Sequence, residues 1–419
     1  MYLYSIRFTA QASYNPYTYQ AVLFILGNDP IFLLRKIHYF LNKSFPAFKA
    51  QMRTLDHPDV QLEYLAEGAA NVVYKISPPD TGPSTAADLH FNDDGYDSDT
   101  PLPTEIPPLQ LDPHLDGKLI RLRKDLPAAT PMEESHRHFE TMIQPLFQED
   151  NLIGSELFQI SRDILRDCNA SLRRMEKNGK RPTKRHGVYL VENEKYGCLI
   201  MDMGPTFGED STCIEFKPKW LVQSPSAPQG SRRCRTCALR AMKRENKADP
   251  PEVSKAGFCP LNLVSYDKTK IGIFLDHVIG PSDDRKASML RGRLIDFLYK
   301  NALLEKLRGL QLELDPDGVF KADLLSPKFL AAMTLRDCTL FLKVCLHFGL
   351  HMHRDSNIAQ VPTSGKGAIE ARLGDLDLKT SSGKKAEYWR SLERQLIDEG
   401  WYTATERDKA AHENLCQLS

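Results

Sequence analysis

Short stretches of alternating apolar and polar residues predict strands in the first half of the chain. Residues 61–65 and 72–76 alternate on either side of the small-residue turn 67–71, and this arrangement is typical of a hairpin. Residues 118–124 alternate apolar with basic side chains, so they predict a third strand.

Residues 131–175 carry apolar residues at helical spacing, which predicts helices there. A basic loop follows at 173–185, and the apolar runs 188–191 and 198–201 predict a second hairpin. The first half of the chain is therefore expected to be a small, largely β lobe with helices attached.

The second half of the chain mixes the two periodicities. Its apolar spacing predicts helices at 286–310, 326–330 and 388–397, and strands at 212–220, 334–342 and 371–378. The whole chain is therefore predicted to be an α+β protein.

Residues 77–117 differ from their surroundings in composition. They contain Pro, Ser and Asp but no Lys or Arg, and they cannot bury enough apolar area to offset the entropy of ordering. We predict a disordered acidic insertion that interrupts a sheet, because the strand 118–124 follows it. Residues 1–60 are expected to form an ill-defined N-terminal extension.

Composition narrows the class of protein but not its partners. The chain has 419 residues, with 55 Lys+Arg against 55 Asp+Glu, so net charge indicates nothing about binding. Nine scattered cysteines favour a reducing compartment, the nucleus or the cytoplasm. The apolar clusters 21–26 and 31–34 fall short of the roughly 18–20 residues that a spanning helix needs, so no membrane span is expected.

Charged residues alternate in the middle of the chain. An extended strand would place Glu215, Lys217 and Lys219 on one face. Two lysines on the same side repel each other unless an anion lies between them. The simpler interpretation is a solvated edge strand that Pro218 ends.

The same logic applies to Asp375, Asp377 and Lys379 near the C-terminus. Alternation would place them on one face, where two adjacent carboxylates need a neutralising cation. Mg²⁺ prefers carboxylate oxygens together with the phosphates of a ligand. The alternative is a surface strand with an ordinary Lys ion pair.

Other basic and small residues have two interpretations each. The turn 67–71 has the geometry that lays backbone N–H groups over phosphates, although with its single glycine an ordinary hairpin turn is the better explanation of this stretch alone. Arg121 and Arg123 share a strand face that points to a nucleotide or to solvent. Arg235 and Lys243 are eight residues apart, close to two helical turns, and could form one basic face.

Cys234 and Cys237 have the spacing of half a zinc site, and Cys259 lies downstream. A closed site needs four ligands, and no second paired motif lies nearby. We therefore expect incidental cysteines on a helix rather than zinc.

A set of motifs occurs in a fixed order from about residue 61 to the C-terminus. They are residues 67–71, 119–124, 215–219, 234–237 with Lys243, 258–263, 332–338, and 375–379 with Tyr388. Together they resemble the inositol-pentakisphosphate 2-kinase family. The Glu-x-Lys-Pro-Lys stretch at 215–219 and the Arg-Asp-Cys stretch at 336–338 are the most diagnostic.

The resemblance implies a divergent two-lobed protein-kinase-like fold. Its β-rich N-lobe would span 61–205, with the insertion 77–117, and its mixed α/β C-lobe would span 206–419. It also implies transfer of the ATP γ-phosphate to the 2-hydroxyl of inositol pentakisphosphate, which gives inositol hexakisphosphate (phytate), with Mg²⁺ as the metal.

The resemblance also implies roles for individual residues. Asp337 matches the catalytic base, Lys219 a catalytic and substrate-binding residue, and Asp375 the metal ligand. The nucleotide would contact Glu67, Gly68, Ala69, Ala70, Asn71, Arg121, Asp202, Glu215 and Arg308. The inositide would contact Arg185, Lys217, Lys219, Arg235, Lys243, Lys379, Lys384 and Tyr388, with Arg181 as the alternative to Arg185.

The sequence departs from the family pattern in the phosphate loop, where Ala66 and Ala69 replace common glycines. This departure keeps a second hypothesis open, an inositol-polyphosphate-binding protein with weak or no turnover. A nucleic-acid-binding protein is a third, but aromatic residues are not interleaved with the basic clusters, and nucleic-acid binding leaves Asp337 and Asp375 without a role. We expect a monomer.

Overall fold

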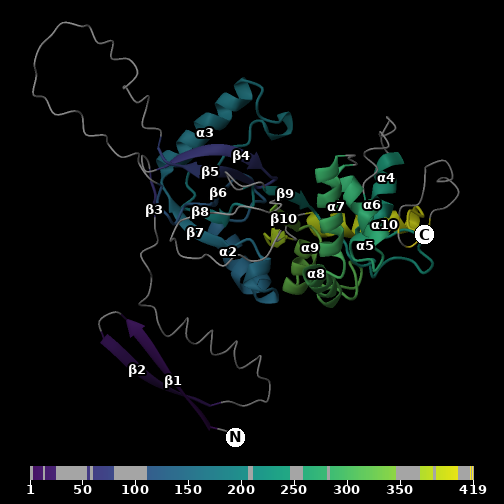
Figure 1. Cartoon of the computed structure of the whole chain (residues 1–419), viewed down its shortest axis with the longest axis horizontal. Coiled ribbons are helices and arrows are strands. Elements are labelled where there is room, and N and C mark those ends of the chain that lie inside the picture. Colours follow the sequence, from purple (N-terminus) through teal and green to yellow (C-terminus); the bar gives the residue numbers. More distant parts are fainter. Residues whose placement is uncertain are drawn as a thin grey trace, which may run out of the picture. The chain divides into compact units, whose positions relative to one another are not determined.

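The computed structural model describes the chain in segments that fall into two compact units, residues 1–53 and 54–419. The described residues are 3–12 and 15–24, for their backbone alone, and 54–56, 60–79, 111–205, 211–245, 258–280, 284–345, 369–380, 384–403, 416 and 418. The first unit holds an antiparallel hairpin of β1 (Leu3–Ala12) and β2 (Asn15–Phe24), drawn in purple in Figure 1. The sections below concern the second unit.

A six-stranded sheet forms the first half of the second unit, in the order β3-β7-β8-β6-β5-β4. Its strands are β3 (Thr54–Leu55), β4 (Gln61–Glu67), β5 (Asn71–Ser77), β6 (Lys118–Arg123), β7 (Ser155–Ile160) and β8 (Tyr196–Met201). The alternation of apolar residues explains the sheet, because Val72, Tyr74 and Ile76 of β5 all face a buried core. The predicted strands at 61–65, 72–76 and 118–124 are confirmed.

Helix α3 (Arg162–Lys177) covers one face of this sheet (Figure 1). Ser161 begins the helix by accepting a hydrogen bond from the backbone N–H of Ile164. Its apolar stripe includes Ile164, Leu165 and Leu172, which share a core with the strands. Arg121 lies on the opposite face of the sheet, because it alternates with Ile120 and Leu122, which face the core.

The second half of the unit combines a three-stranded antiparallel sheet with helices. The sheet has the order β11-β10-β9, formed by β9 (Ser211–Phe216), β10 (Thr339–Cys345) and β11 (Ile369–Gly374). The helices are α4 (Arg235–Glu245), α5 (Pro260–Leu263), α6 (Lys268–Ile279), α7 (Arg285–Leu298), α8 (Ala302–Glu313), α9 (Pro327–Leu335) and α10 (Lys385–Asp398). The predicted α+β class is confirmed.

Several predicted elements in the first half are wrong. The helical prediction for 131–175 includes β7, where Phe158 and Ile160 alternate into the core. Before β7 the chain forms only short helical turns, α2 (Met132–His138), η1 (Phe139–Ile143), η2 (Gln144–Leu146) and η3 (Glu149–Asn151). The predicted hairpin of 188–191 with 198–201 is also wrong, because β8 pairs with β6 and β7 instead.

Predicted elements in the second half needed four corrections, of which the first is that the strand at 212–220 ends at Phe216. The single helix at 286–310 is two helices, because Lys300 has a φ of 54° and Asn301 caps α8. The strand at 334–342 begins only at Thr339, since 334 and 335 end α9. The strand at 371–378 ends at Gly374, because Asp375 has a φ of 55°.

The end of the predicted acidic insertion is folded. Leu115 is buried in the core of the six-stranded sheet, and Leu111 packs against the same core. Residues 80–110 of the insertion lie outside the described residues. Among the helices that the structure describes, none has the length and apolar character to span a membrane.

Candidate active site

Asp337 lies at the centre of a group of lysines, in the turn between α9 and β10. Its carboxylate accepts hydrogen bonds from Lys219 Nζ at 2.8 Å and from Lys379 Nζ at 2.7 Å. Lys217 Nζ lies 3.7 Å from the same carboxylate, donates to the backbone oxygen of Asp337, and also bonds to Asp375. These five residues are named the lysine–aspartate cluster. The structure thus brings together residues that the sequence places more than 100 positions apart.

The turn that carries Asp337 directly follows α9, most of whose residues are buried. Ser326 caps the start of α9, and Pro327 occupies the first turn, where its missing N–H is tolerated. Immediately before Asp337, the buried Arg336 pairs with Asp315 at 2.6 Å and stacks 3.7 Å from the centre of the Trp220 ring. The backbone of the turn that carries Asp337 is therefore fixed by packing.

Lys219 is positioned by its backbone as well as by Asp337. Its φ of 61° is unusual for a residue with a side chain, and Gln311 Nε2 donates to its carbonyl at 2.8 Å. The expectation that Glu215, Lys217 and Lys219 share one strand face is therefore wrong, because β9 ends at Phe216. Both Lys217 and Lys219 still lie beside the carboxylate of Asp337, although their backbone conformations differ.

The lysines change the acidity of the carboxyl that they contact. Burial would raise the pKa of Asp337, but the hydrogen bonds from Lys219 and Lys379 hold it well below its usual range. Burial would lower the pKa of Lys217, but the hydrogen bond to Asp375 raises it. At neutral pH the carboxylate of Asp337 is therefore ionised and the ammonium of Lys217 is charged.

Asp375 and Asp377 point to different partners, so the expectation that they share one face is wrong. Asp375 contacts Lys217, whereas Asp377 accepts a bidentate pair from Arg121 at 2.9 and 3.1 Å. Asn71 and Ser135 also donate to Asp377, at 3.1 and 2.9 Å. The left-handed φ of Asp375 separates the two side chains.

Asp377 therefore ties the six-stranded sheet to the segment that follows β11. Burial would raise its pKa, but the charge of Arg121 and the hydrogen bonds lower it. Arg121 and Asn71, both predicted to contact the nucleotide, are engaged with this carboxylate.

The predicted phosphate loop is a tight turn with a buried anchor. The N–H of Gly68 donates to the carbonyl of Asn71 at 2.9 Å, and Lys124 Nζ donates to the carbonyl of Gly68 at 2.9 Å. The Glu67 side chain is only 2% exposed and pairs with Lys124 and Arg181. The carboxylate of Glu67 thus supports the loop, and its contact with the nucleotide stays a prediction. Residues 68–70 lie at the turn.

The structure distinguishes the two candidate arginines of the N-lobe. The Arg181 side chain is fully buried, and its guanidinium is bound by Glu67, by Glu176 and by the carbonyl of Val188. Arg185 is partly exposed in the short turn η4 (Thr183–Arg185). Arg185 is therefore the arginine that is accessible to a ligand.

Helix α4 separates its two predicted inositide contacts. Arg235 is buried, pairs with Glu393 at 2.7 Å, and stacks 4.4 Å from the centre of the Trp220 ring. Its guanidinium thus has little exposed surface, and its contact with an inositide phosphate stays a prediction. Lys243 is exposed two turns further along the helix.

The start of α10 carries exposed basic and aromatic groups, of which Lys385 lies near the cluster. Lys384 is exposed at the N-cap position, and Tyr388 is 56% exposed one turn later. Lys385 was missed from the sequence. Burial lowers its pKa, and so does the nearby charge of Lys379, which places Lys385 close to the cluster. The two adjacent lysines at 384 and 385 were the only signal available.

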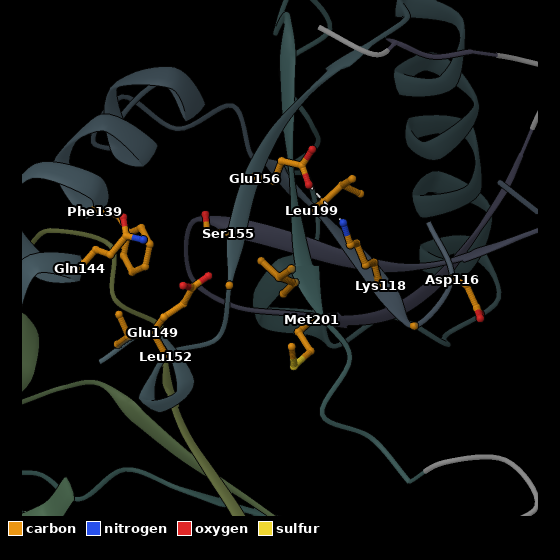
Figure 2. Close-up of a pocket in the computed structure, with 13 residues that line it drawn as sticks. Asp116, Lys118, Phe139, Gln144, Glu149, Leu152, Ser155, Glu156, Leu199 and Met201 are labelled. Atoms are coloured by element: carbon orange, nitrogen blue, oxygen red, sulfur yellow. Dashed lines mark hydrogen bonds and ion pairs between the residues drawn. The ribbon is translucent and has the colours of Figure 1, made fainter. Parts of the chain in front are cut away.

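The family resemblance implies that residues 201–203 are the hinge that contacts adenine. They lie at the end of β8, next to a cavity of about 360 Å³. Figure 2 shows Met201, Leu199, Phe139 and Leu152 around this cavity, together with Lys118 paired to Glu156. Its lining contains no residue of the lysine–aspartate cluster. Asp202 follows directly and accepts a hydrogen bond from the N–H of Gly204 at 2.7 Å.

Two further predicted nucleotide residues lie on separate elements. Glu215 is exposed on β9, opposite Phe341 of β10, on the face away from buried Ile214 and Phe216. Arg308 lies on α8, with its guanidinium 3.8 Å from the carboxylate of Glu305. The structure records no contact of Arg308 with the cluster among the described residues.

The cysteines lie together, contrary to the expectation of incidental cysteines. The sulfur atoms of Cys234, Cys237, Cys259 and Cys416 are all within 4.8 Å of one another. Spacing in the sequence indicated three of these cysteines, whereas Cys416 lies 157 residues after Cys259 and carries no local signal.

Comparison with known proteins gives two matches. Residues 64–395 match the family model described as inositol-pentakisphosphate 2-kinase. The chain is also similar to a Yarrowia lipolytica protein named inositol-pentakisphosphate 2-kinase, with 34% identity over 228 residues. This alignment covers 50% of the present chain and 66% of the Yarrowia protein.

Proposed function

Because the chain belongs to the inositol-pentakisphosphate 2-kinase family, we propose that it transfers the γ-phosphoryl group of ATP to the 2-hydroxyl of inositol pentakisphosphate. The product would be inositol hexakisphosphate. The observation that carries this proposal is one carboxylate, Asp337, held by Lys219 and Lys379 with Lys217 beside it. A substrate with many phosphates requires such a concentration of cationic groups.

Asp337 is proposed to accept the proton of the attacking hydroxyl. A base must lie within hydrogen-bond reach of the proton that it takes. In the free protein the lysines occupy that position, and they keep the pKa of Asp337 low. Substrate phosphates would draw the ammonium groups away, so the pKa of Asp337 would rise towards a value suited to proton transfer.

The inositide phosphates are proposed to bind the ammonium groups around Asp337. Lys217, Lys219 and Lys379 supply the centre of this site. Lys243, Lys384, Tyr388 and Arg185 are exposed or partly exposed and would supply its rim. Lys219 would also neutralise charge on the transferring phosphoryl group, because phosphoryl transfer depends mainly on positioning and charge stabilisation. We add Lys385 to this set on the strength of its proximity to Lys379.

We propose that the nucleotide binds with its adenine at the hinge, residues 201–203, and its phosphates at the tight turn 68–71. The adenine would lie beside Asp202 and the cavity at the end of β8, with Glu215 and Arg308 as outer contacts. Arg121 would reach the phosphates after leaving Asp377.

Asp375 is proposed to hold Mg²⁺. The ammonium of Lys217 lies between the carboxylates of Asp375 and Asp337, so the position already accommodates a positive charge, and carboxylate oxygens are the donors that Mg²⁺ prefers. A bound Mg²⁺ would neutralise charge on the nucleotide phosphates. The reducing compartment is also proposed, since none of the nine cysteines is in a disulfide.

A binding protein without turnover is the second candidate. It is favoured by one observation, the closed pair of Arg121 and Asp377, which occupies a proposed nucleotide contact. The two candidates differ in whether the protein consumes ATP.

Incubation of the purified chain with ATP, Mg²⁺ and inositol pentakisphosphate separates the candidates. We expect inositol hexakisphosphate, with the new phosphate on the 2-hydroxyl when the product is examined by phosphorus NMR. Folded protein that binds inositol pentakisphosphate but forms no product would support the binding protein. A product phosphorylated elsewhere would contradict the proposed reaction.

A further inference from the structure

Gln311 of α8 is a buried polar residue that contacts both of the segments that carry Lys219 and Asp337. It is 0% exposed. Its Nε2 group donates one hydrogen bond to the carbonyl of Lys219 at 2.8 Å and another to the carbonyl of Leu335, two residues before Asp337, at 3.1 Å. The amide thus joins the residue that supplies an ammonium group to the segment that supplies the carboxylate.

The other polar groups of Gln311 are engaged with the same two segments. Its Oε1 accepts a hydrogen bond from the N–H of Leu221 at 2.8 Å, and its backbone carbonyl accepts one from Arg336 Nη2 at 3.2 Å. Both N–H bonds of the amide and its oxygen therefore have partners. Every partner of these groups lies within two residues of Lys219 or Asp337.

Lys219 needs such an anchor because its backbone conformation is unfavourable. A φ of 61° lies in the left-handed region, where the Cβ of a residue with a side chain crowds the following carbonyl oxygen. An unrestrained chain would relax to negative φ, which would redirect the side chain. The hydrogen bond from Gln311 restrains the carbonyl of Lys219, and the ammonium then lies 2.8 Å from the carboxylate of Asp337.

The helix that carries Gln311 is a firm support for its amide. The leucines of α8 at positions 303, 304, 307 and 310 are buried in the core that the helices share with the three-stranded sheet. α8 also packs beside α9, which leads directly to the turn of Asp337. Groups held on packed helices keep a more exact position than groups on loops.

A purely structural role explains these contacts less well. Buried backbone carbonyls need hydrogen-bond partners, and a buried amide often supplies them. Asn169 of α3 is such a case, because it is 1% exposed and binds the N–H and the carbonyl of a single residue, Leu190. Gln311 instead bridges two segments, and one of its partners is a lysine of the lysine–aspartate cluster.

We propose that Gln311 is a positioning residue that holds the backbone of Lys219 so that its ammonium meets the carboxylate of Asp337. It acts through these two residues and not on the substrate, since its side chain is buried and bound to backbone groups. The inference rests on the proposed function, in which Lys219 binds an inositide phosphate and Asp337 accepts the proton. A displacement of about 1 Å in such a site can cost roughly 100-fold in rate.

Steady-state kinetics of Gln311→Met test the proposal. Methionine keeps the length of glutamine and removes its hydrogen bonds, so kcat/KM for inositol pentakisphosphate should fall by roughly 10–100-fold. The KM for ATP should change far less. The matched control is Asn169→Leu, which removes the buried amide of α3 and should lower the Tm while kcat/KM stays unchanged. An equal fall in kcat/KM for the control would overturn the proposal.

A double-mutant cycle with Lys219→Met separates positioning from a general effect on stability. In the Lys219→Met background, Gln311→Met should lower kcat/KM little further, because the lysine that it positions is absent. A structural role acts independently of Lys219, so the same factor in both backgrounds would overturn the proposal.

The crystal structure of Gln311→Met tests the same point without turnover. Lys219 should adopt a negative φ, with its ammonium out of contact with Asp337; an unchanged φ and an unchanged contact would overturn the proposal. Wild-type protein that forms no product would contradict the proposed function alone, because the structure of the variant still decides the role of Gln311.

A second variant, Gln311→Asn, covers the case in which Gln311→Met does not fold. Asparagine keeps the amide, but its shorter side chain does not span both carbonyls. Folded Gln311→Asn should show the same fall in kcat/KM and the same displacement of Lys219. Wild-type kinetics in this variant would overturn the proposal. Failure of both variants to fold would assign Gln311 to stability alone and would do the same.

Discussion

Asp337 combines two properties that conflict in the free protein. Its proposed role is to accept a proton from a hydroxyl surrounded by phosphates, yet the lysines around it lower its pKa and would weaken it as a base. The conflict disappears if the lysines bind phosphates when substrate arrives. The pKa of Asp337 is then tied to occupation of the inositide site, so the base is strengthened only when its substrate is present.

Replacement of Lys219 tests the inositide site. Lys219→Met keeps the apolar stem and removes one charge-assisted hydrogen bond, worth about 1.5–3 kcal/mol. We expect the KM for inositol pentakisphosphate to rise by roughly 10–100-fold, since about 1.4 kcal/mol corresponds to a factor of ten. The KM for ATP should change far less. Steady-state kinetics with each substrate varied in turn measure both values.

The control for Lys219→Met is Lys306→Met, which removes an exposed lysine of α8. It should leave both KM values unchanged. Equal increases in the two KM values of Lys219→Met would argue against its assignment to the inositide.

The pH dependence of kcat/KM tests the electrostatic coupling. Lys379 lowers the pKa of Asp337, so Lys379→Met should raise that pKa towards its ordinary value of about 3.9. A carboxylate is ionised above its pKa, so the acidic limb that Asp337 contributes to kcat/KM should move to higher pH. Lys243→Met is the control, because Lys243 is exposed on α4 and does not contact Asp337. Superimposable acidic limbs in both variants would contradict the coupling.

At the scale of elements, periodicity predicted the strands that carry one clear alternation. β4, β5 and β6 were correct because their apolar residues alternate towards one core, although those of β4, Leu62 and Tyr64, are only half-buried. β7 was missed because its short apolar pattern, with Phe158 and Ile160 buried, is embedded between helical stretches of the same spacing. A six-residue strand does not carry enough periods to be distinguished there.

Backbone conformation limited the prediction of the site itself. The sequence identified the residues of the cluster through a family resemblance, but alternation placed them on the wrong faces. Lys219 and Asp375 both adopt positive φ, which no side-chain pattern reveals. These two residues bend the chain where regular strands were expected, and the bends bring the lysines to Asp337 and separate Asp375 from Asp377.

The turn 67–71 should depend on the buried charges beneath it. Arg181→Met leaves the Glu67 carboxylate without one of its two cationic partners, so we expect a loss of about 3–5 kcal/mol in the free energy of unfolding. Chemical denaturation measures the change. Arg166→Met is the matched control, since Arg166 pairs with Asp163 on the surface of α3, and it should cost less than about 1 kcal/mol. Equal losses in the free energy of unfolding for Arg181→Met and Arg166→Met would contradict a stabilising role of the buried Glu67–Arg181 pair.

At the scale of the whole second unit, single contacts join parts that are distant in the chain. Arg121 and Asp377 connect the six-stranded sheet to the segment after β11, and the N–H of Ile153 donates to the carbonyl of Leu373 at 2.9 Å. The N–H of Cys234 likewise donates a hydrogen bond to the sulfur of Cys416, 182 residues later in the chain. Such long-range contacts could not be predicted from the sequence, because the local spacing of residues carries no information about them.

The most direct test of the account compares binding and turnover in Asp337→Asn. The substitution keeps the size of the side chain and removes the proton acceptor, so kcat should fall by roughly 10²–10⁴-fold, as expected for loss of a general base. Calorimetry should still detect inositol pentakisphosphate binding, because the lysines remain. The measurement is inositol hexakisphosphate formation beside the wild type under saturating ATP and Mg²⁺. A variant that binds the substrate and forms product at the wild-type rate would contradict the account.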